Sequence, residues 1–171
     1  SRQRDYAADA LTTNRPDLPL SVFAADCIVI LLCDPVAGCV GAVHAGWRGT
    51  ALRIVQKTVE QMAAEFGAQP ERIQAAIGAG IAVCCFETDA DVPQAMADAM
   101  GQEAQPFLQR RGEKWMVDLK GLNRRQLELA GVPGKQVEVS DLCTACHPAL
   151  YWSHRKMGHA RGVQAAAILW K

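Results

Sequence analysis

A cysteine and a histidine interrupt two neighbouring apolar runs near the start of the chain. Cys27 lies within FAADCIVILL, and His44 lies near the end of CVGAVHA. The short DPVAG turn joins the two runs, so we expect an antiparallel strand pair that brings Cys27 and His44 close together. A thiolate and an imidazole can together bind zinc or act as an activated nucleophile. They can also serve packing and polar satisfaction alone, and the spacing leaves these alternatives open.

The sequence GWRG follows almost directly after His44 and adds a cation to the candidate site. Gly46 and Gly49 permit unusual backbone angles and a close approach of the main chain to a ligand. Arg48, placed between these glycines, could bind a planar anion such as phosphate through its guanidinium group. The simpler alternatives are a surface salt bridge for Arg48 and a packing role for Trp47.

The hydrophobic pattern around these residues predicts an α/β protein with a mixed sheet. Runs with strand character span 21–33, 39–45, 72–78, 115–119, 135–141 and 161–171, and helical patterns span 52–66, 89–100 and 120–131. Gly67 is placed to cap the first helix, and Gly131 is placed to end the last. The small residues of 161–171 predict a strand that is buried on both faces.

Length and composition exclude several classes of protein. We expect residues 1–171 to form a single domain with one sizeable core. The 18 Lys and Arg residues balance the 18 Asp and Glu residues, so no global field favours a nucleic acid or an acidic membrane surface. No apolar stretch is long enough to span a bilayer. The odd count of 7 cysteines argues against a disulfide framework and indicates reduced thiols in the cytoplasm.

A second group of cysteines and histidines lies near the C-terminus. Cys143, Cys146 and His147 match the C-x-x-C-H pattern of covalent haem attachment. A long α/β chain without a visible export signal argues against haem. The same three residues with His154 could instead form a second zinc site.

Two other segments stand out by their side chains. Cys84 and Cys85 are adjacent, and we expect them to pack, because vicinal disulfides are strained. The segment SHRKMGHARG carries several cations and histidines, and its simplest interpretation is a solvated loop.

Taken together, the motifs resemble those of the multicopper polyphenol oxidoreductase family, also described as laccase-domain or YfiH-like. The resemblance rests on ADC followed by an apolar strand and DP, then GAVHAGWRGT, with ADALTTN before them, IGAGIAVCCFETDADV in the middle, and DLCTAC and YWSHRKMGHARG near the end. It extends over essentially the whole chain. With this resemblance, the packing-only interpretation of Cys27 and His44 loses most of its support.

The resemblance implies a fold and a metal site. The fold would be a mixed-sheet, four-layer α/β/β/α sandwich, similar to the catalytic domain of cytotoxic necrotizing factor toxins. Family members bind a metal, usually zinc, through two histidines and one cysteine, which implies that Cys27 and His44 are metal ligands here. The other histidine of the family precedes the ADAL segment. This chain begins at Ser1 without it, and we expect that ligand upstream of Ser1.

The resemblance also implies an activity. The expected function is a zinc-dependent purine nucleoside phosphorylase acting on adenosine, inosine and methylthioadenosine, with adenosine deaminase activity through zinc-activated water. Cys27, His44 and Arg48 would be the catalytic residues. Arg48 and Arg155 would bind phosphate, Glu87 would orient a ligand or the substrate ribose, and the segment around Arg155 would be a lid. The expected partners are a nucleoside and phosphate, with a homodimer as the assembly.

Three other functions remain open at this point. The first is a copper-dependent polyphenol oxidase, although the 4 histidines of the chain are too few for a multicopper centre. The second is a Cys–His hydrolase or deamidase, with Cys27 as the nucleophile and His44 as the base. The third is a binding module without turnover.

Overall fold

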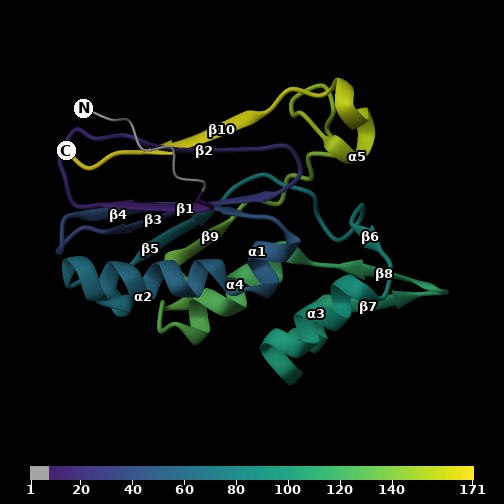
Figure 1. The fold of residues 1–171 in the computed structure, drawn as a ribbon, viewed down its shortest axis with the longest axis horizontal. Helices are drawn as coiled ribbons and strands as arrows, with labels where there is room; N and C mark the ends of the chain where they lie inside the picture. The colour runs from purple at the N-terminus through teal and green to yellow at the C-terminus, as the bar shows by residue number, and fades with distance from the viewer. Residues whose placement is uncertain (1–7) are drawn as a thin grey trace.

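A mixed five-stranded sheet forms the centre of the fold in the computed structural model, which describes residues 8–171 (Figure 1). Its strands span Ala10–Thr13 (β1), Ile28–Asp34 (β3), Cys39–Ala45 (β4), Gln74–Ile77 (β5) and Val137–Val139 (β9). The strand order is β1–β4–β3–β5–β9, in which β5 and β9 run parallel and the other neighbours run antiparallel. The α/β class and the mixed sheet expected from the sequence are confirmed.

Helices and two smaller sheets surround this central sheet. Their bounds are Leu20–Ala24 (β2), Trp47–Ala51 (α1), Ile54–Phe66 (α2), Glu87–Thr88 (β6), Asp91–Met100 (α3), Leu108–Arg111 (β7), Lys114–Val117 (β8), Leu119–Leu129 (α4), His154–Met157 (α5) and Gln164–Ile168 (β10). Short 3₁₀ helices span Pro70–Arg72, Gly101–Phe107, Gly134–Gln136 and Gly158–Ala160. Helices α2 and α4 cover one face of the central sheet, and the antiparallel β2–β10 pair covers the other (Figure 1). The β6–β8–β7 sheet and α3 lie together at one end.

The two faces of the central sheet bury separate hydrophobic clusters. The larger cluster, on the helical side, includes Ile30, Met62 and Leu122. The smaller cluster, between the two sheets, includes Val22 and Val29. Residues 8–171 therefore build three layers of the expected α/β/β/α sandwich. Of the outer helical layer over β2–β10, they provide only the short α5 at one end (Figure 1).

The β3–β4 hairpin is antiparallel, as predicted. Its register pairs Ile28 with Ala45 and Val29 with His44. The buried carboxylate of Asp34 organises the connecting turn by accepting the backbone N–H groups of Val36 at 2.9 Å and Ala37 at 3.1 Å. The hairpin register is thus fixed at both ends, by the turn and by the pairing around His44.

The chain turns sharply between β2 and β3, where the sequence predicted one continuous strand over 21–33. β2 ends at Ala24 and β3 begins at Ile28, and Asp26 between them has a φ of +79°. The two strands belong to different sheets. The prediction of one strand is wrong because the apolar character continues through the turn, and the left-handed residue is an aspartate rather than a glycine.

The helix predicted over 52–66 begins earlier and is interrupted. α1 starts at Trp47, inside the GWRG sequence, and Arg53 separates it from α2 with a φ of +58°. Leu52, which the pattern placed on the buried face, lies at this break and is 65% exposed. Gly67 caps the C-terminus of α2 with a φ of +70°, as predicted.

The C-terminal strand differs from its prediction in burial. The range 161–171 was expected to be buried on both faces, but the residues of β10 alternate between half-buried and exposed. Ala166 and Ile168 pack against the smaller hydrophobic cluster. The prediction is wrong because β10 pairs with β2 in an outer sheet, whose far face is solvent-exposed over these residues.

The remaining predicted elements are confirmed with shifted ends. These are β5, α3, β8, α4 and β9. Asp118, which the sequence placed in a strand, caps the N-terminus of α4 by accepting the N–H of Gly121 at 3.0 Å. Among the described residues, no helix is both long and apolar enough to cross a membrane.

Candidate functional site

Cys27 and His44 lie side by side at one end of the β3–β4 hairpin. Cys27 directly precedes β3, and His44 is the penultimate residue of β4. Because Ile28 pairs with Ala45, the hairpin register places Cys27 next to Gly46 and within reach of His44. The structure therefore brings together the two residues that the spacing singled out.

Gly46 is needed here for space. A Cβ atom built on this residue would lie 3.1 Å from the Cys27 sulfur and 3.7 Å from Cε1 of His44. A side chain at this position would require the thiol to shift by a few tenths of an ångström, so the glycine leaves room for the Cys–His pair, although its φ of −67° is one that any residue can adopt.

Asp9 orients the imidazole of His44, and the sequence analysis missed it. The carboxylate of Asp9 lies 3.0 Å from Nδ1 of His44, and the backbone N–H of His44 donates to the Asp9 carbonyl at 2.7 Å. A carboxylate accepts the Nδ1 proton and leaves Nε2 available to a metal or substrate. Asp9 belongs to the ADALTTN segment, and only the pairing of β1 with β4 brings it to the site.

The imidazole of His44 is cationic near neutral pH in the chain without a metal. The Cys27 side chain has the largest influence and raises the pKa of His44, burial opposes this rise, and the Asp9 carboxylate adds to it. Together these influences raise the pKa of His44 from 6.5 to about 9. A metal that binds Nε2 must therefore displace a proton.

Arg48 and Trp47 form the next part of the site. The Arg48 guanidinium lies over the Trp47 ring, with its central carbon 4.2 Å from a ring centroid. Arg48 is exposed and Trp47 is half-buried. This cation–π stacking holds a positive charge at the rim beside the Cys–His pair.

Two adjoining pockets meet at Cys27 and Trp47. The first, of about 240 Å³, contains the Cys–His pair and is lined by Asp9, Cys27, His44, Gly46, Trp47, Arg48 and Gly49. The second, of about 250 Å³, is more apolar and is lined by Ala25, Asp26, Cys27, Trp47, Ile81, Phe86, Leu119, His154, Arg155 and Arg161. A larger cavity of about 440 Å³ lies away from this site, over β3, β5 and β9. We assign the candidate site to the paired pockets, because they contain the convergent thiol, imidazole and guanidinium groups.

Arg155 lines the second pocket and belongs to α5, in the segment that the sequence analysis proposed as a lid. Its guanidinium donates to the backbone carbonyls of Cys85 at 3.0 Å and Glu87 at 3.1 Å. It is exposed and lies near the Phe86 ring. The side chain of Glu87 is not among the groups that line either pocket, so only its carbonyl is linked to the site.

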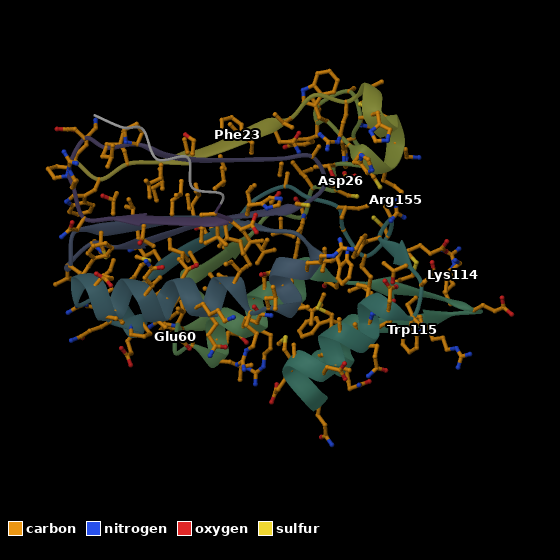
Figure 2. All side chains as sticks on the ribbon, in the orientation of Figure 1. Phe23, Asp26, Glu60, Lys114, Trp115 and Arg155 are labelled. Atoms are coloured by element: carbon orange, nitrogen blue, oxygen red, sulfur yellow. The ribbon has the colours of Figure 1, made fainter. Side chains whose placement is uncertain are left out.

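Asp26 links the β2–β3 turn to the segment around Arg155 and is a second residue that the sequence analysis missed. Its carboxylate accepts the Thr144 hydroxyl at 2.6 Å, the Ser153 hydroxyl at 3.1 Å and the Arg155 backbone N–H at 2.7 Å. Figure 2 shows Asp26 and Arg155 near each other at the end of the β2–β10 layer. The only sequence signal was the position of Asp26 beside Cys27.

The second metal site proposed from sequence has a different composition in the structure. The sulfur atoms of Cys143 and Cys146 group with those of Cys84 and Cys85, all within 4.8 Å of one another, and neither His147 nor His154 belongs to this group of ligand atoms. Such a group could hold a metal ion. All four thiols are free.

The neighbours of these side chains explain the difference. His147 Nδ1 lies 2.9 Å from the Cys143 carbonyl oxygen, and His154 stacks edge-on with His159. Cys143 is buried, and its sulfur accepts the Ala82 N–H at 3.4 Å.

The thiols of this four-cysteine group have different proton affinities. Burial would raise the pKa of Cys143, but the backbone N–H groups of Ala82, Cys146 and Ala145 outweigh it and lower the value to about 7. Burial and the neighbouring thiols raise the pKa of Cys85 to about 12. The group therefore accommodates one negative charge readily and resists a second in the absence of a cation.

Known proteins share both the sequence and the fold of this chain. A purine nucleoside phosphorylase of Deinococcus radiodurans is 43% identical over 95% of this chain and 61% of its own length. An adenosine deaminase named RL5, from an unknown prokaryotic organism, is 38% identical over 88% of this chain and 57% of its own length. The chain thus spans about three fifths of the length of these curated relatives.

A solved structure and a family model agree with these relatives. The crystal structure of the Bacillus licheniformis hypothetical protein YfiH superposes with a TM-score of 0.93 and 37% identity, over 96% of this chain and 62% of that one. The model described as "Multi-copper polyphenol oxidoreductase laccase" matches residues 1–171. The chain belongs to this laccase-like YfiH family.

Proposed function

We propose that the chain forms the active site of a purine nucleoside phosphorylase. In this reaction phosphate attacks C1′ of the ribose and the purine leaves, which yields a free base and ribose 1-phosphate. The observation that carries the proposal is the shared wall of the two pockets, where an apolar cavity with arginines meets the Cys27–His44 pair. The relatives named purine nucleoside phosphorylase support it.

The apolar pocket suits a purine base. Trp47, Phe86, Ile81 and Leu119 supply aromatic and aliphatic walls on which a flat heterocycle can stack. These walls also keep water away from the ribose, which favours attack by bound phosphate over hydrolysis.

Three arginines around the pockets suit phosphate. Arg48 lines the first pocket, and Arg155 and Arg161 line the second. Guanidinium groups bind phosphate oxygens through paired hydrogen bonds, and they stay charged at every physiological pH. Stacking on Trp47 restricts Arg48, so little side-chain entropy remains to be lost when phosphate binds.

The Cys27–His44 pair fits zinc. The pair offers a thiolate and an imidazole, the ligand types that zinc prefers, and Asp9 holds His44 by the carboxylate–histidine contact that is typical of metal sites. His44 is the only described histidine that lines the first pocket, and the family pattern calls for one more histidine ligand. Bound zinc would supply a Lewis acid at the boundary of the two pockets.

The proposal is tested on the full-length protein with adenosine as the substrate. Adenine and ribose 1-phosphate should form only when phosphate is present, and treatment with a chelator should abolish their formation. Arg48→Ala should lower kcat/KM for phosphate on the order of 100-fold. The control is Arg124→Ala on the exposed face of α4, which should keep wild-type turnover. Release of adenine without phosphate, or full phosphorolytic activity of the Arg48→Ala protein, would refute the assignment.

Adenosine deamination is the second candidate function, because one relative is named an adenosine deaminase. The same assay separates the two reactions. Deamination yields inosine and ammonia and does not require phosphate, so Arg48→Ala should lower phosphorolysis far more than inosine formation.

Copper-dependent oxidation of polyphenols is supported by the family description alone. Its test is the metal content of the same preparation. If the preparation contained no zinc, and its copper content correlated with the rate of dye oxidation, the oxidase would be favoured over the phosphorylase. A Cys–His hydrolase would instead lose activity on alkylation of Cys27 and keep it in the presence of a chelator.

A further inference from the structure

Two turns that are far apart in the sequence bring four cysteines to one point. Cys84 and Cys85 lie in the turn after β5, and Cys143 and Cys146 lie in the turn after β9. The Cys146 sulfur lies 3.6 Å from that of Cys84 and 3.4 Å from that of Cys85. All four sulfur atoms lie within 4.8 Å of one another.

This spacing matches the shell of a zinc ion. Zinc–sulfur bonds are about 2.3 Å long, and tetrahedral geometry then separates the sulfur atoms by about 3.8 Å. The contacts of the Cys146 sulfur with those of Cys84 and Cys85 fall slightly below that value, and no pair of sulfur atoms is more than 4.8 Å apart, so a metal ion needs only small shifts to sit at the centre.

The backbone holds the four-cysteine group in place. Gly80 and Cys143 form a parallel bridge between the two segments, and Thr144 donates its N–H to the Gly80 carbonyl at 3.2 Å. The Ala82 N–H donates to the Cys143 sulfur at 3.4 Å. Backbone N–H groups that point at sulfur favour a thiolate over a thiol. Cys84 and Cys146 are exposed, so an ion can enter from solvent.

Cations lie next to the group. Lys120 donates to the carbonyls of Ser140 at 2.7 Å and Leu142 at 2.8 Å, at the start of the turn that carries Cys143. Arg155 donates to the Cys85 carbonyl at 3.0 Å. Zinc with four thiolates carries a net charge of about −2, and these two side chains are placed to offset it.

We propose that Cys84, Cys85, Cys143 and Cys146 bind one zinc ion as a structural site, separate from the Cys27–His44 pair. On binding, the thiols release their protons to solvent, and no electron transfer is involved. The ion would fasten the Cys85–Glu87 segment to the turn after β9. It would thereby fix the two carbonyls to which Arg155 is bound.

The test isolates this site by removing the other thiolate. Full-length protein carrying Cys27→Ser should retain about one zinc per chain after exhaustive desalting, measured by elemental analysis. Adding Cys143→Ser and Cys146→Ser should remove that zinc. The matched control is Cys27→Ser with Cys33→Ser, which changes a half-buried thiol of β3 and should keep it. A Cys27→Ser protein that binds no zinc would overturn the proposal.

A second measurement does not depend on the folding of the variants. In the Cys27→Ser protein, added zinc should slow alkylation of Cys84 and Cys146 at least about tenfold, as located by peptide mass spectrometry, and leave Cys33 unchanged. Replacing zinc with cobalt should give the intense absorption of thiolate-to-metal charge transfer. A disulfide between Cys146 and Cys84 or Cys85 in the purified protein, or equal alkylation with and without zinc, would overturn the proposal. Neither result would bear on phosphorolysis at the other site.

Discussion

At the scale of single residues, three carboxylates organise the candidate site and its hairpin. The exposed Asp9 orients His44, the buried Asp26 holds the segment from Ser153 to Arg155, and the buried Asp34 closes the hairpin turn. Asp26 and Asp34 each accept several hydrogen bonds, so removal of either carboxylate leaves several donors without partners.

Replacement of Asp26 by Ala should destabilise the protein strongly. It removes the acceptor of the Thr144 hydroxyl, the Ser153 hydroxyl and the Arg155 N–H. We expect the free energy of unfolding to fall by about 2–4 kcal/mol, measured by urea denaturation. The control Asp98→Ala changes an exposed residue of α3 and should cost less than about 1 kcal/mol. If both variants lost the same free energy of unfolding, Asp26 would not hold the segment from Ser153 to Arg155.

Asp34 should make the free energy of unfolding depend on pH in the acid range. Burial would raise the pKa of its carboxyl, but the N–H groups of Gln69, Ala37 and Val36 and the guanidinium of Arg72 outweigh burial and lower it. A lowered folded-state pKa stabilises the protein above the unfolded value near 3.8, and this contribution is lost as the pH falls through the folded value.

The measurement compares the free energy of unfolding of the wild type and Asp34→Asn across pH. The wild type should be more stable at pH 6, and its advantage should shrink as the pH falls below about 4. An advantage that stays constant into strong acid would contradict the assigned shift.

Residue types and spacing revealed the Cys27–His44 pair because a short hairpin leaves little freedom in which residues meet. Asp9 could not be found in this way, since it precedes β1, a strand of only four residues with a weak hydrophobic pattern. The role of Asp26 was not predicted, because an aspartate with a left-handed backbone conformation carries no sequence signature of its own. The sequence indicated only Cys143 and Cys146 as metal ligands of the four-cysteine group. Cys84 and Cys85 were not predicted to join them, because the two turns meet through the tertiary pairing of Gly80 with Cys143.

At the scale of elements, the segment after β5 crosses close behind the start of β3. A Cβ atom on Gly80 would lie 2.6 Å from Cδ1 of Ile28, 3.1 Å from the Asp26 carbonyl oxygen and 3.3 Å from that of Cys27. The absence of a side chain therefore lets one segment approach the backbone that carries Cys27 and also pair with Cys143.

Gly80→Ala should accordingly disturb both regions. The added methyl group must displace backbone as well as a side chain, so we expect a loss of about 1–3 kcal/mol in the free energy of unfolding. Gly134→Ala is a matched control, because its Cβ would meet the flexible ends of Glu128, at 3.0 Å, and Arg124, at 3.6 Å, and no backbone atom within 4 Å is among its nearest neighbours. If thermal or urea denaturation shows the two variants to be equally stable, the close crossing does not constrain the fold.

At the scale of the whole molecule, helices cover one face of the central sheet, and the two-stranded β2–β10 sheet covers the other. The β2–β10 pair buries its inner side chains against β3 and β4, and its outer side chains face solvent over the described residues. Phe23, on the outer face of β2, is 60% exposed (Figure 2).

Truncation of one inward-facing and one outward-facing side chain should show how differently the two faces of the β2–β10 sheet contribute to stability. Ile168→Ala removes inward-facing surface from the smaller hydrophobic cluster and should lower the free energy of unfolding by about 1–3 kcal/mol. Phe23→Ala removes an outward-facing ring and should cost less than about 1 kcal/mol when measured on the same 171 residues. Similar losses by urea denaturation would show that the outer face of β2 is covered in solution.

The layer order at this scale was partly predictable. Alternating strand and helix signals indicated a mixed α/β fold, and the short DPVAG turn indicated an antiparallel pair. The division of 21–33 between two sheets, and the exposed face of β10, depend on which strands pair across the molecule. A local pattern of apolar residues does not contain that information.

The contacts of Asp26 have a consequence for the order in which the molecule forms. Cys27 and His44 belong to one hairpin, whereas Asp26 binds partners that lie 118, 127 and 129 residues further along the chain. Local hairpins close quickly, and contacts over long separations form late. A chain emerging from the ribosome can thus assemble its thiol–imidazole pair while Arg155 and Arg161 are still untranslated. Completion of the paired pockets then depends on residues that follow Asp26 by 118 to 129 positions.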